Sequence, residues 1–91
     1  ISTTGWGEHF IRNVVAYDIA AQIIYDNKSI EEASIKSLDK VMKTGGDGGV
    51  IGLDNKGNIS MEFNTAGMYR ASVDINGKVT IKIYSDWSEG L

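Results

Sequence analysis

The sequence contains no cysteine, no proline and only one histidine, His9. Without a thiol, the chain can supply neither a thiolate nucleophile nor a disulfide framework, and one histidine alone cannot form a Cys/His zinc site. We therefore expect neither a metal ion nor a cofactor. The missing cysteines leave the compartment undecided between cytoplasm and periplasm.

Runs of like charge and long apolar segments are also missing. The net charge of -3 comes from scattered residues, and no basic surface with interleaved aromatic residues is available to neutralise phosphates, so nucleic acid is not an expected partner. A composition of 42% hydrophobic and 23% charged residues is typical of a globular protein and predicts neither disorder nor a membrane span. The first residues have no initiator Met and no signal-peptide pattern, so we expect a further segment upstream.

The spacing of the apolar residues predicts two helices. Between residues 8 and 25 the apolar positions cover most of a helix circumference, which indicates one helix that is buried on several sides. Residues 26–28 interrupt the pattern. Ser29 and Glu32 then have the spacing of a capping box, which predicts a second helix that ends at residues 44–46.

Strands are expected before and after these helices. Residues 1–4 are typical of a strand end, and Asn76-Gly77 favours a type I′ turn in a hairpin. Tyr84 and Trp87 are expected in a core or an interface. The later strands form two predicted hairpins, at residues 50–53 with 59–63 and at residues 69–75 with 78–84.

This order predicts an α+β fold, in which two helices are followed by antiparallel strands. A domain of 91 residues buries only about 60 to 65% of its unfolded surface, so the chain is expected to be marginally stable alone. Its sheet edges would be left for strands from other segments. We therefore interpret residues 1–91 as a single partial domain.

Two glycine-rich segments are candidates for binding chemistry. Residues 2–7 combine hydroxyls with glycines at a strand-to-helix junction, which can hold an anion or an oxyanion, although an ordinary helix cap explains the spacing alone. Residues 45–49 lack the Lys-Ser/Thr of a phosphate-binding loop, so a helix C-cap followed by a strand is the preferred interpretation. His9 has no evident partner, so we interpret it as a solvated or capping residue.

Four ordered motifs nevertheless resemble one family when they are taken together. The chain resembles the plant-type asparaginases, also called isoaspartyl or β-aspartyl peptidases, over about residues 2 to 71, whereas residues 72–91 match nothing. The motifs are Thr4-Gly5-Trp6-Gly7-Glu8-His9-Phe10-Ile11-Arg12, Ala16-Tyr17-Asp18-Ile19, Gly45-Gly46-Asp47-Gly48-Gly49 and Phe63-Asn64-Thr65-Ala66-Gly67-Met68-Tyr69-Arg70.

The resemblance implies an enzyme of the N-terminal-nucleophile hydrolase class, with a four-layer αββα sandwich. A precursor of this family cuts itself into α and β subunits, and the new N-terminal threonine attacks the side-chain amide of L-asparagine or the isopeptide bond of a β-aspartyl dipeptide. Its own α-amine is the base. The chain would be the C-terminal part of the β subunit, with the nucleophile outside it. Its implied partners are the α subunit and the remainder of the β subunit, in a dimer of αβ heterodimers.

The resemblance also implies roles for individual residues. Thr4 matches the threonine whose hydroxyl stabilises the oxyanion, and Gly5 matches a glycine that contacts oxyanion and substrate. Gly7 matches a glycine of the substrate pocket. We expect Trp6 to bind substrate together with Thr4, Gly5 and Gly7, but it stands where the family more often has a smaller residue, which leaves the substrate range open.

Two alternatives remain at this point. The chain could be a non-catalytic assembly or binding piece, or part of a glycosylasparaginase. Glycosylasparaginases usually lack the segment seen here at residues 64–70, which argues against the second alternative.

Overall fold

A computed structural model describes residues 1–84, apart from the side chain of Arg12, so the expectation for Trp87 lies outside the described residues. The fold is α+β, as predicted, with helices followed by antiparallel strands. Its elements are β1 (Ser2–Gly5), α1 (Gly7–Arg12), α2 (Val15–Asp26), α3 (Ile30–Lys43), β2 (Gly48–Leu53), β3 (Ile59–Phe63), β4 (Arg70–Val73) and β5 (Val79–Lys82).

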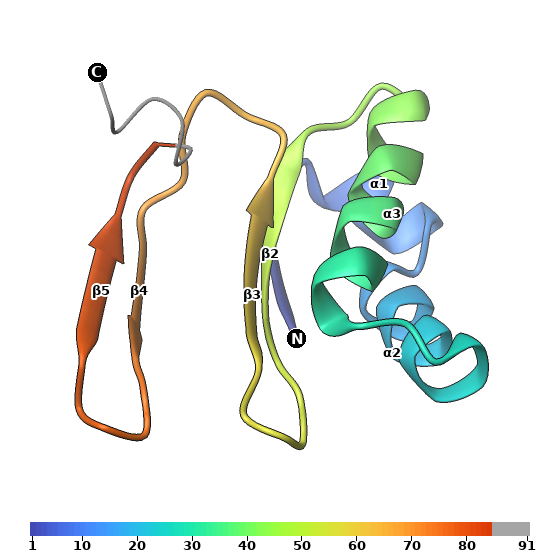
Figure 1. Cartoon of the computed structure of the whole chain (residues 1–91). Helices are drawn as coiled ribbons and strands as arrows, with labels where there is room; N and C mark the ends of the chain where they lie inside the picture. Colours follow the sequence, from blue (N-terminus) through green and yellow to red (C-terminus); the bar gives the residue numbers. More distant parts are fainter. Residues whose placement is uncertain (85–91) are drawn as a thin grey trace.

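These elements form layers (Figure 1). The helices cover one face of an antiparallel sheet in the order β1-β2-β3, and the β4-β5 hairpin stands on the other side of that sheet. The order helix, sheet, second β layer is consistent with part of an αββα sandwich. Within residues 1–84, no helix has the length and apolar character needed to cross a bilayer.

The first predicted helix is divided in two, so the expectation of one continuous helix over residues 8–25 is wrong. Val14 adopts a left-handed conformation, with φ of 49° and ψ of 51°. Asn13 ends α1, and its side-chain Nδ2 donates to the His9 carbonyl oxygen at 2.7 Å. The apolar pattern continues across the break because α1 and α2 both bury residues in the same core, as Phe10 and Val15 do.

The second helix, α3, begins as its capping box predicts. The Ser29 Oγ accepts from the Glu32 backbone N–H at 3.1 Å and donates to the Glu32 carboxylate at 3.2 Å. Its inner face closes the core between the helices and the sheet. The core residues are Phe10, Val15, Ile19, Ala33, Leu38, Val41 and Val50.

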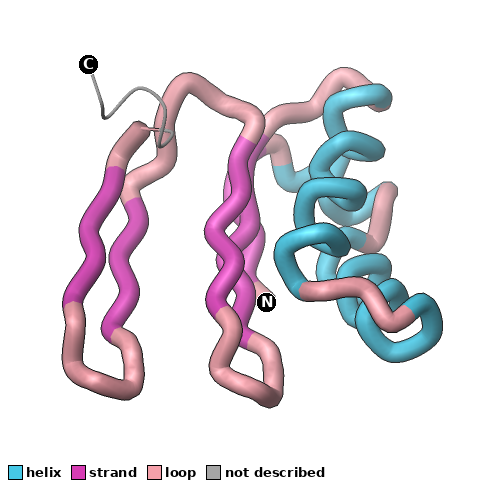
Figure 2. Tube along the Cα trace, in the orientation of Figure 1, coloured by secondary structure: helices cyan, strands magenta, loops and turns pink. Residues whose placement is uncertain are grey.

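Both predicted hairpins are present, but the turn between β4 and β5 is not type I′. Of Asn76 and Gly77, only Gly77 has a positive φ, of 81°. The Asp74 carboxylate accepts from the backbone N–H groups of Asn76 and Lys78, at 2.9 and 2.8 Å. The β2-β3 turn is built in the same way on Asp54 and Gly57. Figure 2 shows both turns at the same end of the molecule, opposite the loop that joins β3 to β4.

Candidate active site

Two glycine segments meet where β1 pairs with β2. Gly5 lies opposite Gly48 in the antiparallel register, and the Trp6 N–H donates to the Asp47 carbonyl oxygen at 3.1 Å. A Cβ on Gly48 would collide with the Thr4 carbonyl oxygen and lie 2.9 Å from the Gly5 Cα. The two backbones therefore approach so closely that only glycine fits.

Residues 45–49 reach this contact by first capping α3. The Gly45 and Gly46 N–H groups donate to the Met42 and Val41 carbonyls, both at 3.0 Å, and Gly45 has a φ of 91°. This double hydrogen bond is a Schellman motif, so the predicted helix C-cap is confirmed. The strand entry is confirmed as well, because β2 begins at Gly48.

A pocket of about 380 Å³ lies beside the Gly5–Gly48 contact, and we call it the Thr4 pocket. It collects residues from three of the four motifs that carry the family resemblance. Its lining consists of hydroxyls, backbone groups and uncharged side chains. The lining residues are Thr4, Gly5, Gly48, Gly49, Thr65, Gly67, Met68 and Tyr69.

The loop between β3 and β4 forms the other wall of the Thr4 pocket. The Thr65 hydroxyl donates to the Gly67 carbonyl at 2.8 Å, and the Met68 N–H donates to the Ile83 carbonyl at 2.6 Å. The Met68 sulfur occupies the space that a Cβ on Gly49 would need. This contact fixes the loop against the glycine segment.

Arg70 connects this loop to the second β layer. Its guanidinium lies 4.7 Å from the centre of the Phe63 ring and donates to the Met68 carbonyl at 3.1 Å and the Tyr84 carbonyl at 2.8 Å. A planar guanidinium, with five donors in a fixed fork, suits these three contacts better than the compact ammonium of a lysine. Arg70 thus ties the ends of β3, β4 and β5 to the pocket wall.

The structure brings together only two of the four residues singled out from the sequence. Thr4 and Gly5 border the Thr4 pocket, whereas Trp6 and Gly7 are not among its lining residues. Trp6 is 58% exposed and stacks on His9, with ring centres 5.8 Å apart. Gly7 instead borders a separate hollow with Thr3 and Phe10 on the helix side.

His9 is a packing residue beside the end of α3. Its side chain is 13% exposed, so most of it is buried and not in solvent. The Nδ1 atom lies 3.3 Å from the Oγ1 of Thr44, the C-cap residue of α3, and the ring covers Gly46. This contact joins α1 to the end of α3 that leads into the pocket.

No catalytic or substrate-binding role was predicted for Gly48, Gly49, Thr65, Met68 or Tyr69, although Gly48 and Gly49 were expected at the entry to a strand. Each belongs to a motif that the resemblance had picked out, and that was the signal available. Hydroxyl and backbone N–H groups can stabilise the negative oxygen that forms when a carbonyl is attacked. Among residues 1–84, no group of three His, Asp or Glu side chains is placed to hold a metal ion.

Comparison with known sequences agrees with the resemblance. The sequence model of the family described as Asparaginase matches residues 1–83. The chain belongs to the plant-type asparaginase/isoaspartyl peptidase family. It is similar to the isoaspartyl peptidases of Escherichia coli strain K12, with 49% identity over 78% of this chain, and Salmonella typhimurium strain LT2, with 46% identity over 78%.

A Dictyostelium discoideum protein, whose name gives isoaspartyl peptidase/L-asparaginase, is 45% identical over 92% of this chain. The chain spans 22%, 23% and 27% of the lengths of the E. coli, S. typhimurium and D. discoideum relatives. It therefore corresponds to about a quarter of each of these members of the asparaginase family.

Proposed function

We propose that this chain supplies the oxyanion-stabilising side of an amidohydrolase active site. The observation that carries the proposal is that Thr4 and Gly5 border one pocket together with Gly48, Gly49 and the loop of residues 65–69. The substrates are the side-chain amide of L-asparagine, β-aspartyl dipeptides, or both. Membership of the asparaginase family and the names of its relatives support this substrate class.

The chemistry assigned to this chain is electrostatic. When a nucleophile attacks the amide carbonyl, the carbonyl oxygen becomes negative, and the Thr4 hydroxyl and the Gly5 backbone N–H stabilise that charge. Such donors accelerate a reaction because they interact more strongly with the transition state than with the substrate. The described residues that line the Thr4 pocket carry no charge, so on this side of the site the stabilisation comes from hydroxyl and backbone dipoles.

The remaining groups come from other parts of the enzyme in this proposal. An N-terminal threonine, released by self-cleavage of a precursor, attacks the amide, and its α-amine takes the proton. The α subunit and the remainder of the β subunit supply this threonine and the groups that hold the substrate's α-carboxylate and α-amine. The exposed apolar side chains of the described residues, such as Leu53 and Ile81, support such an assembly, in which they would be covered.

Hydrolysis by the purified full-length protein tests the proposal. Ammonia release from L-asparagine and amino-acid release from a β-aspartyl dipeptide are measured in parallel, and intact-mass analysis shows whether one polypeptide begins with threonine. We expect turnover of at least one substrate and a threonine-initiated polypeptide. A folded, self-cleaved protein that hydrolyses neither substrate would contradict the proposal.

A further inference from the structure

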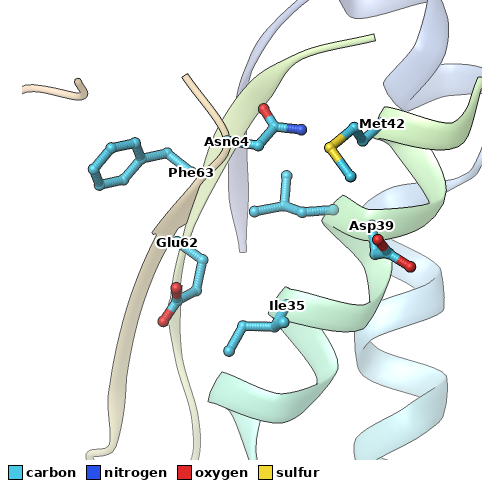
Figure 3. Close-up of a pocket in the computed structure, with 7 residues that line it drawn as sticks. Ile35, Asp39, Met42, Glu62, Phe63 and Asn64 are labelled. Atoms are coloured by element: carbon cyan, nitrogen blue, oxygen red, sulfur yellow. The ribbon is translucent and has the colours of Figure 1, made fainter. Parts of the chain in front are cut away.

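Asn64 follows the last residue of β3 and binds both backbone polar groups of Gly48. Its backbone N–H donates to the Gly48 carbonyl at 3.0 Å, and its side-chain Oδ1 accepts from the Gly48 N–H at 2.7 Å. Figure 3 shows the Asn64 carboxamide and the Phe63 ring pointing to opposite sides of β3. We propose that Asn64 is a positioning residue, which fixes the glycine wall of the Thr4 pocket from the far side of the sheet.

The side chain of Asn64 adds one hydrogen bond to the β2-β3 ladder beyond the last paired residues of the two strands. The β2-β3 pairing ends with Gly49 opposite Phe63. One residue further, the carboxamide oxygen replaces the strand carbonyl as the acceptor for Gly48. Gly48 is thereby held on the β3 side by two hydrogen bonds, while its other side is pressed against Thr4 and Gly5.

Asn64 does not border the Thr4 pocket, so its effect there is indirect and passes through Gly48, which it holds by two hydrogen bonds. It lines a different cavity of about 350 Å³, together with Leu38 and Met42. Figure 3 shows Asn64 and Met42 in the space between β3 and α3. Its Nδ2 is buried and has no hydrogen-bond partner among the residues that the structure describes. An unpaired buried donor is destabilising, so the structural benefit of this side chain lies in its oxygen.

The consequence for catalysis rests on the proposed function. If Gly48 can move, Thr4 and Gly5 lose the surface against which they are packed, and the oxyanion donors lose their alignment. Because those donors act mainly in the transition state, kcat falls while KM changes little. A misplacement of about 1 Å can reduce the rate by as much as 10²-fold, so we expect a loss of about ten- to a hundredfold.

Paired substitutions in the full-length protein test this inference. Asn64→Leu keeps the shape of the side chain but removes the acceptor, whereas Asn64→Asp keeps an acceptor oxygen. Asn64→Gln keeps the carboxamide but moves it outward by one methylene. Asn58→Leu is the matched control, because Asn58 lies at the opposite end of the same β2-β3 hairpin, where its side chain binds Asp54.

Two readouts are compared, kcat and KM on the better substrate and hydrogen–deuterium exchange of the backbone at residues 46–50. Asn64→Leu is expected to lower kcat about ten- to a hundredfold with KM within about threefold, and to speed exchange at Gly48. In Asn64→Asp, kcat and the exchange rate at Gly48 are expected to lie close to those of the parent. In Asn58→Leu, both quantities are expected to be unchanged. If Asn64→Leu does not fold, Asn64→Asp must still exceed Asn64→Gln in kcat.

Three results would overturn the inference. They are a kcat for Asn64→Leu within about twofold of the parent, an Asn64→Asp enzyme no better than Asn64→Leu or Asn64→Gln, or a loss confined to KM. Exchange at Gly48 does not depend on catalysis. If the parent enzyme proved inactive, unchanged exchange at Gly48 in Asn64→Leu would still refute the positioning role of Asn64. Faster exchange would support that role, and only the proposed function would then have failed.

Discussion

Gly5 and Gly48 pair across β1 and β2 with their Cα atoms so close that a Cβ built on Gly5 would lie 2.6 Å from the Gly48 Cα. In the other direction, a Cβ on Gly48 would also lie 2.9 Å from the Phe10 ring. A side chain at either position has to displace backbone, which cannot move as a flexible side chain can. The contact thus fixes the positions of two residues that border the Thr4 pocket.

Gly48→Ala is accordingly expected to reduce the free energy of unfolding by about 3 kcal/mol or more, since overpacking adds to the strain of a positive φ. Gly57→Ala is the matched control, because Gly57 also has a positive φ, of 87°, but open space around it. Its cost should be about 1 kcal/mol. Urea denaturation of the full-length variants measures both values, and equal losses would contradict the close contact.

Trp6 is expected to matter for stability more than for asparagine hydrolysis. Its indole stacks on His9 outside the Thr4 pocket, so Trp6→Ala should cost about 1 kcal/mol, and Trp6→Phe should keep part of the stacking. We expect kcat/KM for L-asparagine to stay within about threefold in both variants. A change of more than about tenfold in the ratio of dipeptide to asparagine hydrolysis would instead place Trp6 in the substrate site, as the family resemblance implies.

The turn between β2 and β3 should respond to acid through Asp54. The side-chain amide of Asn58 donates to this carboxylate and, with the N–H groups of Asn58 and Lys56, lowers the pKa of Asp54 below its ordinary value, although partial desolvation opposes the shift. Because the pKa of Asp54 is lower in the folded state than in the unfolded state, its ionised carboxylate stabilises the fold above about pH 4. This stabilisation is lost as the pH falls through the folded-state pKa.

Asn58→Ala is expected to raise the pKa of Asp54 toward its ordinary value and to weaken this acid dependence. The carboxyl carbon shift of Asp54, followed by NMR through the acid range, measures it. Asn55→Ala is the control, because Asn55 is an exposed residue of the same turn. An unchanged pKa in Asn58→Ala would show that the backbone N–H groups alone hold the carboxylate.

Local signals in the sequence predicted most of the elements. Ser29 and Glu32 marked the start of α3 because both partners of a capping box lie within one turn. The break at Val14 was not predicted, since the apolar pattern runs through it and a left-handed β-branched residue is rare. The β4-β5 turn was assigned from Asn76-Gly77, although the repeated Asp-x-x-Gly of both turns was the better signal.

The site was less accessible to such reasoning. Thr4 and Gly5 were chosen through the family resemblance, because spacing alone favoured an ordinary helix cap. The contact between Gly5 and Gly48 joins residues far apart in the chain, and no local pattern encodes that distance. Asn64 was noted in the sequence only as part of the fourth motif. Its hydrogen bond to Gly48 depends on the position at which β3 ends, which the sequence pattern does not specify.

The adjacent threonines of β1 allow the most direct test of the central claim. Thr4 borders the pocket with Gly48, whereas Thr3 borders the hollow on the helix side with Gly7 and Phe10. In the full-length enzyme, Thr4→Ala is expected to lower kcat about 10²- to 10³-fold without a loss of fold, and Thr3→Ala to leave kcat within about twofold. Near-normal turnover of the Thr4→Ala enzyme would contradict the assignment of this pocket to oxyanion stabilisation.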